Sequence, residues 1–366
     1  MKKSPMETYI RWRGDLSFSQ AGFNDVDNLI FSALSYLDFS PVFTDEKTTE
    51  MKLKDCADII EQPGAYRLKT LEGGYEDTVK AILRSRRFGE ITVREYCEIF
   101  SEEDQTQFSA CEFVIDGRTS YVSFRGTDNT IIGWKEDFIL SYSLISSQKY
   151  AAEYLKKVMR PLRKYYVGGH SKGGNLALFA CAMLDAKKRK KLIKVYANDS
   201  PGFSPEVLDI RLLEPLADRI VRINPAFCVI GRIFEIPYGR TEIVDVNESG
   251  LLQHDLFLWK LMGTGYEDAE GYDKVSDWVS RSIKEWVENI DPAERRIFVD
   301  DVFNTLSAGG AMTVQEITGK GLMKVIASAY SGTSDTTKKL IKDLVSAAAM
   351  QAAPEKAGQQ AADREK

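Results

Sequence analysis

The chain has 366 residues, of which 43% are hydrophobic and 28% are charged, and such fractions are typical of a globular protein with a large core. Its formal net charge of −5 argues against nucleic acid as the main partner and against a polybasic membrane anchor. The five cysteines stand singly, without zinc-site spacing, and no apolar run reaches the roughly 18 residues of a membrane span. We therefore expect reduced thiols, no signal peptide, no metal or other cofactor, and a cytoplasmic protein.

The N-terminal part of the chain is expected to be mainly helical. Apolar residues recur at helical spacing over 24–39, and Asn24 precedes them as a suitable N-cap. Segments 75–86 and 92–104 are also predicted to be helices. We interpret residues 1–105 as a helical N-terminal segment that packs on the core of the protein.

Strands appear after residue 105. Two β-rich runs flank Asp116-Gly117, a dipeptide that is typical of a tight hairpin turn. Helices are then predicted over 147–163, 172–190 and 204–217, and strands over 164–169, 192–198, 219–223 and 241–246. Strands that alternate with helices of this length indicate an α/β fold with a mostly parallel sheet covered on both faces. We assign residues 106–268 to this core.

The C-terminal part returns to a helical pattern. Residues 269–350 are predicted to be helical, with Trp278 and Trp286 available for packing. The segments 322–330 and 338–350 are predicted to pack on the sheet, with a membrane surface or a partner helix as the alternative. The polar residues 351–366 are predicted to form a disordered tail.

A glycine-rich junction between a predicted strand and a predicted helix is the strongest candidate for chemistry. Residues 169–173 match the pattern G-x-S-x-G, in which Ser171 would be a nucleophile on a strained turn. Flanking glycines avoid clashes at such a turn, and the N-terminus of the following helix adds positive potential. Chance supplies this pentapeptide in roughly one chain in ten of this length. The interpretation therefore depends on the strand before it and the helix after it.

A nucleophilic serine needs a base and an acid that orients the base. The chain has only two histidines. His170 directly precedes Ser171, so its side chain should point away from the serine hydroxyl. His254 follows the last predicted strand by a short loop, which is where a base is expected in this type of fold. We therefore predict His254 as the base.

Two aspartates remain as candidates for the acid. Asp199 ends the strand that follows the serine unit, which would bring it and Ser171 to the carboxyl edges of neighbouring strands. Asp245 lies near the end of a later predicted strand and is the rival candidate. Asp255 adjoins His254 in the chain, so the two side chains should diverge. We favour Asp199.

Two backbone N–H groups are expected to bind the oxyanion that such a reaction creates. One belongs to Lys172, the residue after the nucleophile. The other is expected from the loop in "YVSFRGTDN", where Gly126 permits a tight turn and Thr127 provides the donor.

These motifs resemble those of class 3 (fungal-type) lipases in the α/β-hydrolase superfamily. The resemblance rests on "VSFRGTDN", "GWKEDF" and "GGHSKGGNLA", and it covers roughly residues 108–260. It implies the α/β-hydrolase fold, with Ser171 as nucleophile, Thr127 as oxyanion donor and His254 as base. The N-terminal segment and "NDSPGF" further resemble an uncharacterised bacterial family of lipase-like proteins.

The position of the acid departs from the class 3 pattern. Those lipases carry an Asn-Asp step where this chain has Asn224-Pro225. Some other lipase families take the acid from one strand earlier, in a turn that "NDSPGF" resembles. This resemblance supports Asp199.

The sequence therefore favours a serine acyl-hydrolase that cleaves a small-molecule or lipid ester through a Ser-His-Asp triad and an acyl-enzyme. A thioesterase or an acyltransferase with the same site is one alternative. A catalytically inactive binding module with this fold is the other. The segment 227–239 is predicted to form either part of an acyl-binding wall or lid, or a buried turn.

Overall fold

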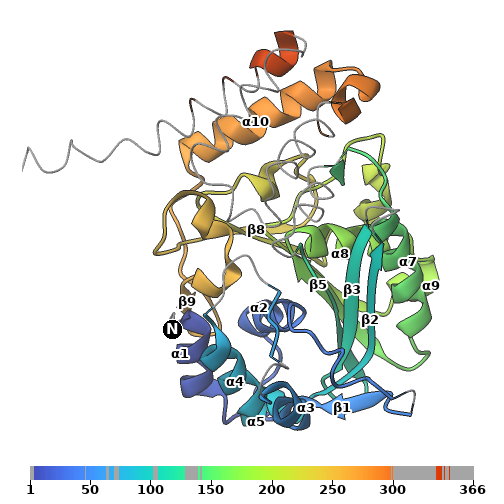
Figure 1. Ribbon diagram of the computed structural model, residues 1–366, viewed down its shortest axis with the longest axis vertical. Coiled ribbons are helices and arrows are strands. Elements are labelled where there is room, and N and C mark those ends of the chain that lie inside the picture. Colours follow the sequence, from blue (N-terminus) through green and yellow to red (C-terminus); the bar gives the residue numbers. More distant parts are fainter. Residues whose placement is uncertain are drawn as a thin grey trace, which may run out of the picture.

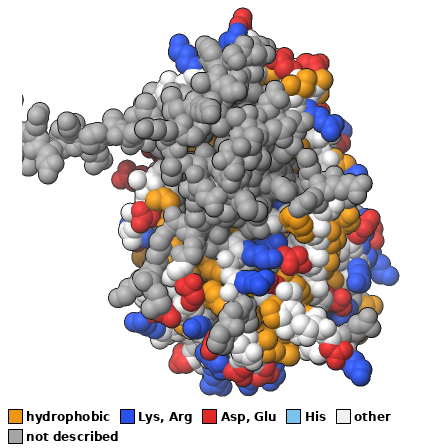
Figure 2. Space-filling view, viewed as in Figure 1, with side chains coloured by type: hydrophobic (Ala, Val, Ile, Leu, Met, Phe, Trp, Pro, Cys, Tyr) orange, Lys and Arg blue, Asp and Glu red, His pale blue; other side chains and the backbone are white. Residues whose placement is uncertain are grey.

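The centre of the molecule is one large sheet with helices on both sides (Figure 1). The computed structural model describes residues 4–45, 47–62, 66–69, 74–101, 106–127, 139–140, 142–297, 299, 335–339, 342 and 346. On the face seen in Figure 2, the described Lys and Arg side chains are interspersed with Asp and Glu.

The sheet has eight strands whose spatial order follows the chain. They are β1 (Glu50–Lys52), β2 (Thr92–Ser101), β3 (Thr106–Val114), β4 (Thr119–Phe124), β5 (Lys164–His170), β6 (Leu192–Asn198), β7 (Ile220–Pro225) and β8 (Arg240–Val244). Strands β1 to β4 pair in antiparallel fashion, and β4 to β8 pair in parallel. The β3–β4 pair confirms the hairpin predicted at Asp116-Gly117. The carboxyl ends of β4 to β8 meet at one edge, which we call the carboxyl edge.

Helices cover both faces of this sheet. The α-helices are α1 (Pro5–Arg13), α2 (Asp25–Leu34), α3 (Leu53–Ile60), α4 (Glu76–Arg84), α5 (Arg86–Gly89), α7 (Ser146–Val158), α8 (Lys172–Ala182), α9 (Ala186–Arg189) and α10 (Lys274–Asn289). Neighbouring residues of β4 face opposite sides, so Tyr121 packs with α2 and Val122 with α7 and α8. The predicted α/β architecture, a mostly parallel sheet flanked by helices, is confirmed, but residues 1–105 are not only helical, because they contribute β1 and β2 to this sheet.

Shorter elements complete the described chain. They are the two-stranded sheet of β9 (Leu261–Met262) and β10 (Gly265–Tyr266), and the 3-10 helices η1 (Ile210–Leu216), η2 (Ile230–Arg232), η3 (Gly250–His254) and η4 (Leu256–Leu258).

The helix predicted over 24–39 is confirmed as α2, and Asn24 caps it. The Asn24 side chain accepts hydrogen bonds from Val26 N and Asp27 N, and the Asp27 carboxylate accepts one from Asn24 N in return. Such a capping box satisfies N–H groups that a helix start would otherwise leave unpaired. The predicted helix 75–86 is confirmed as α4.

The helix predicted over 92–104 is wrong, because residues 92–101 form β2, and residues 102–104 lie outside the described residues. A bulge between Arg94 and Cys97, with Glu95 at a φ of 52°, interrupts the alternation that would have marked a strand. The charged residues also misled the prediction. The Arg94 guanidinium binds Glu112 within the sheet at 2.8 Å instead of facing solvent on a helix.

Two other predicted helices differ in detail. The helix predicted over 172–190 is divided, because α8 ends at Ala182 and Asp185 caps the short α9. The segment 204–217 is not an α-helix. Its helical part is the 3-10 helix η1, which contains Pro215, a residue that cannot donate a backbone hydrogen bond.

The C-terminal part contains α10, which confirms a helix within 269–350. Trp286 is buried there, and Trp278 is partly buried against the same apolar cluster. The segment 322–330, most of 338–350 and the tail 351–366 lie outside the described residues. Within the described part, no helix is long and apolar enough to cross a membrane. All five cysteines are free, and Cys97 is the half-buried one.

Candidate active site

Ser171 stands between the last residue of β5 and the first residue of α8. Its φ of 57° and ψ of −128° lie in a region that residues other than glycine rarely adopt. A β-carbon at Gly169 would lie 2.5 Å from the Phe124 carbonyl oxygen, and one at Gly173 would lie 2.1 Å from the same atom. Both glycines of the G-x-S-x-G pattern are therefore required, because the end of β4 passes so close to this elbow.

Two buried asparagines, Asn28 and Asn198, belong to the hydrogen-bond network around the elbow. The Asn198 backbone carbonyl at the end of β6 accepts a hydrogen bond from Ser171 N at 2.9 Å, and the Asn198 side chain donates one to the Gly169 carbonyl at 3.0 Å. Its side chain also contacts Asn28 and Ser32 of α2. This network joins α2 to the strained turn, so the N-terminal segment contributes directly to the position of Ser171.

His254 lies at the end of η3 and contacts Ser171 and Asp199. Its Nε2 is 3.0 Å from Ser171 Oγ, and its Nδ1 is 2.6 Å from Asp199 Oδ2. An ionised carboxylate can only accept a hydrogen bond, so Nδ1 carries the proton. Nε2 then accepts the hydrogen bond from the serine hydroxyl. Ser171 and Asp199 are buried, whereas the His254 side chain is 12% exposed. The structure thus places the three residues in the hydrogen-bonding order of a hydroxyl, a base and an acid.

Asp199 is held by the segment that contains η2. Its Oδ1 accepts hydrogen bonds from Gly231 N at 2.9 Å and from the Cys228 thiol at 3.0 Å. Burial, together with the adjacent Asp199, raises the pKa of Cys228 well above its ordinary value, so the thiol keeps its proton and acts as the donor. Part of segment 227–239 is therefore a buried turn beside this aspartate.

The rival acids make other contacts. Asp245 forms an ion pair with the Lys260 ammonium, which precedes β9. Asp255 accepts a hydrogen bond from the Tyr75 hydroxyl at 2.7 Å and caps η4 through Phe257 N. The side chains of His254 and Asp255 therefore diverge, as expected, because His254 contacts Asp199 and Asp255 contacts Tyr75.

Asn224 directly precedes Pro225, the position where the resemblance would have an acid. A β-carbon at Gly231 would lie 2.6 Å from Asn224 Oδ1 and 2.8 Å from Asp199 Oδ1. The two positions, on neighbouring strands, therefore converge on the same glycine. The Asp199 carboxylate after β6 thus lies beside the end of β7, next to the position where the class 3 pattern has its acid.

His170 has a role in the structure that sequence reasoning missed. Its Nε2 is 2.8 Å from the backbone oxygen of His254, and its Nδ1 is 2.8 Å from the Tyr36 hydroxyl. The carbonyl can only accept, so Nε2 carries the proton and Nδ1 accepts from Tyr36. The side chain therefore points away from Ser171, as expected, and holds the backbone of His254. No local sequence signal identifies Tyr36, which is 134 residues away in the chain.

Protonation of His170 is predicted to destabilise the fold. Burial, with a smaller contribution from His254, holds the pKa of His170 well below its ordinary value. Below a pH of about 6.5, the unfolded chain binds a proton at this residue that the folded chain does not bind. The free energy of unfolding should therefore fall by about 1 kcal/mol from this residue between pH 6.5 and 5.5. Urea unfolding of wild type and His170→Gln checks this, and equal pH dependence in the two proteins would contradict it.

The loop after β4 lies beside the elbow. A β-carbon at Gly126 would lie 2.6 Å from the His170 carbonyl oxygen and 2.0 Å from the Tyr36 hydroxyl. Thr127, the predicted oxyanion donor, is buried directly after this contact. Lys172 begins α8, and its buried ammonium donates to the Gln107 carbonyl at 2.8 Å. Residues 128–138, which include "GWKEDF", lie outside the described residues.

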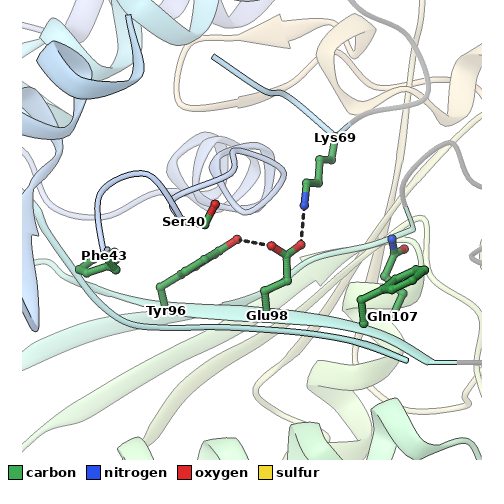
Figure 3. A pocket seen from close by; sticks show the side chains of 7 residues that line it. Ser40, Phe43, Lys69, Tyr96, Glu98 and Gln107 are labelled. Carbon is green, nitrogen blue, oxygen red and sulfur yellow. Dashed lines mark hydrogen bonds and ion pairs between the residues drawn. The ribbon is translucent and has the colours of Figure 1, made fainter. Parts of the chain in front are cut away.

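A pocket of about 530 Å³ lies beside β2. Its lining residues, drawn in Figure 3, are Ser40, Phe43, Lys69, Tyr96, Glu98, Phe100 and Gln107. The Glu98 carboxylate accepts from Lys69 Nζ at 2.5 Å and from Arg125 Nη1 at 2.8 Å. Burial would raise the pKa of Glu98, but Arg125 and Lys69 hold it below its ordinary value. These paired charges brace the loop through Arg125, the residue before Gly126.

The chain is similar to several known proteins. A family model described as Mbeg1-like matches residues 82–304. The Rhizomucor miehei lipase in its propeptide complex is 16% identical, with a TM-score of 0.36, over 68% of this chain and 82% of that chain. The M37 lipase is 15% identical, with a TM-score of 0.34, over 57% of this chain and 69% of that chain. No curated protein matches the chain.

The matched range of the family model covers more than half of the chain. It begins within α4, includes β2 to β8 with the segment that carries Ser171, Asp199 and His254, and extends past α10. The chain therefore belongs to the Mbeg1-like family.

Proposed function

We propose that this protein is a serine acyl-hydrolase that cleaves a carboxylic ester through an acyl-enzyme. The observation that carries the proposal is the series of two hydrogen bonds that joins Ser171 Oγ through His254 to Asp199. The strained elbow supports it. Ser171 has a φ of 57°, and the backbone packs tightly against Gly169 and Gly173 on either side, which holds this strained conformation in place. Strain of this kind is typical of a functional residue.

The first half of the reaction acylates the serine. Ser171 Oγ attacks the ester carbonyl carbon while its proton moves to His254 Nε2. The backbone N–H groups of Thr127 and Lys172 bind the oxyanion of the tetrahedral intermediate. The intermediate then collapses, the C–O bond to the alcohol breaks, and His254 gives its proton to the departing alkoxide.

The second half releases the acid. A water molecule attacks the acyl carbon and passes a proton to His254 Nε2, and the bond to Ser171 Oγ breaks as the proton returns to that oxygen. Asp199 stays ionised throughout and stabilises the imidazolium that forms twice in each cycle. The substrate is a small-molecule or lipid ester, and no step requires a cofactor.

Hydrolysis of short p-nitrophenyl esters tests this function. Wild-type protein should release p-nitrophenol and the free carboxylic acid in equal amounts. Product analysis at increasing concentrations of an acceptor alcohol separates hydrolysis from acyl transfer, and acyl thioesters tested in parallel identify a thioesterase. Absence of turnover on esters and thioesters by the folded protein would instead favour a binding module.

The Cys228 thiol is predicted to help position Asp199. Cys228→Ala removes one of the two donors to Asp199 Oδ1, whereas Cys228→Ser retains a hydroxyl donor. Loss of a donor worth about 1 kcal/mol should lower kcat roughly fivefold, with KM unchanged, and the serine variant should retain most activity. Steady-state kinetics on a p-nitrophenyl ester measure both parameters.

Cys181→Ala is the matched control, since Cys181 is equally buried but lies in α8 within an apolar cluster. It should change stability without changing kcat. An equal loss of kcat in both alanine variants would assign Cys228 a packing role only.

A further inference from the structure

Basic residues from three segments gather at the amino-terminal edge of the parallel strands. These segments are the end of α7, the loop between α7 and β5 together with the first residue of β5, and α9 with the residues that lead into β6. We define the basic face by six lysines in them: Lys156, Lys164, Lys187, Lys188, Lys190 and Lys191. The chain as a whole has a net charge of −5, so this concentration of positive charge opposes the overall balance.

Contacts between the segments hold this face together without cancelling its charge. Three ammonium groups donate to backbone carbonyls of another segment, each over 2.9 Å: Lys188 to Lys156, Lys191 to Arg160 and Lys164 to Lys190. A carbonyl is neutral, so each lysine keeps its full positive charge toward solvent. All three bonds lie at the exposed surface.

Carboxylates are scarce around these lysines. Within the described part of the chain, none of the six forms an ion pair, and Glu95 instead lies near Arg160 at 3.6 Å. Asp185 caps α9 by accepting from Lys188 N. That hydrogen bond and the ammonium groups of Lys188 and Lys187 hold the pKa of Asp185 below its ordinary value. Even this exposed carboxylate therefore experiences a positive environment.

Leu162 precedes Lys164 of the basic face by two residues in the chain. Its side chain is 92% exposed in the loop between α7 and β5, with Arg163 next to it. A single exposed leucine is ordinary on a protein surface. An exposed leucine whose neighbours in the chain include Arg160, Arg163 and Lys164 has a more specific use, because it can enter the apolar region that lies just below charged lipid headgroups.

We propose that the basic face docks on an anionic phospholipid surface, with its lysines against the lipid phosphates and Leu162 inserted between the headgroups. Each cation near such a surface strengthens binding by about fivefold. Insertion of the Leu162 side chain buries apolar area and strengthens the binding further. Surfaces that bind single-stranded nucleic acid combine cations with exposed aromatic rings, but here the exposed apolar residue is a leucine and the nearby Tyr165 is buried.

This surface lies at the amino-terminal edge of the parallel strands, and the candidate active site lies at their carboxyl edge. Strand β5 begins at Lys164 and ends beside Ser171, and β6 begins at Leu192 and ends beside Asp199. In Figure 1, α9 lies at the lower right of the sheet, far from α10. Docking therefore tethers the protein while leaving the carboxyl edge exposed, and it is independent of ester hydrolysis.

Vesicle co-sedimentation of the full chain tests the proposal. Wild type should bind vesicles of phosphatidylglycerol and phosphatidylcholine, and phosphatidylcholine alone should not bind it. Binding should weaken strongly at roughly 1 M salt, where charges are screened beyond a few ångströms. The double variant Lys187→Glu/Lys190→Glu should bind at least about tenfold more weakly, and Leu162→Ser several-fold more weakly.

Lys274→Glu/Lys284→Glu is the matched control, because it makes the same change in net charge on exposed positions of α10. It should retain wild-type binding within about twofold. Circular dichroism and turnover of a soluble ester should be unchanged in every variant. Equal loss in the control, equal binding to neutral vesicles, or binding of an oligonucleotide but not of vesicles would overturn the proposal.

Discussion

Replacing Ser171 with alanine is expected to abolish ester hydrolysis and to leave the fold intact. The variant removes the only atom of this residue that could form the acyl-enzyme, and His254 then has no hydroxyl to activate. In serine hydrolases that use a triad, such a loss lowers kcat by orders of magnitude, so a fall of at least about 10,000-fold is expected here. Hydrolysis of a p-nitrophenyl ester measures it, and circular dichroism and a thermal melt report on folding.

Ser200→Ala provides the control for this experiment. Ser200 is also buried at the carboxyl edge, one residue after Asp199, but its hydroxyl contacts only the Pro201 carbonyl among the hydrogen bonds of the described chain. Its replacement should change activity by less than about threefold. A Ser171→Ala protein that retains wild-type turnover would exclude the proposed mechanism.

Replacing Asp199 with asparagine is expected to lower kcat/KM by about 1,000-fold to 10,000-fold. The contacts of Asp199 explain why. Gly231 N and the Cys228 thiol both donate to Oδ1, so the amide oxygen of an asparagine must occupy that position and its NH2 group must face His254. The imidazole would then accept at Nδ1 and carry its proton on Nε2. In that tautomer it cannot take the proton of the Ser171 hydroxyl.

Asp245→Asn separates the two candidate acids. It removes the ion pair with Lys260, which is half-exposed, and should cost at most about 1 kcal/mol of stability. Activity should stay within about threefold of wild type. A large loss of kcat/KM in Asp245→Asn with little loss in Asp199→Asn would reverse the assignment of the acid.

Elements with a continuous local pattern could be predicted from the sequence. The strands β5 to β8 and the helices α2, α4 and α7 have clear periodicity and recognisable ends. The strand β2 could not, because its bulge at Glu95 disrupts the period of two and its charged residues find partners only across the sheet. Tertiary pairing, which a local pattern does not contain, decides such a segment.

The candidate site divides in the same way. The elbow and the base have local signals, namely the glycines around Ser171 and the scarcity of histidine. The choice of Asp199 stays a prediction, but its surroundings depend on Gly231, a residue 32 positions later in the chain. The hydrogen bond from Tyr36 to His170 spans 134 positions. Contacts at such separations follow from the sheet order and have no counterpart in a short motif.

Labelling with a fluorophosphonate tests the central claim most directly, because this reagent bonds covalently to an activated serine. Mass spectrometry of the digested wild-type protein should find the phosphonate on Ser171, at one group per chain. Labelling should be lost in Ser171→Ala and should be slowed by orders of magnitude in His254→Ala. A folded wild-type protein that stays unlabelled, or that carries the label on another serine, would contradict the assignment of Ser171 as the nucleophile.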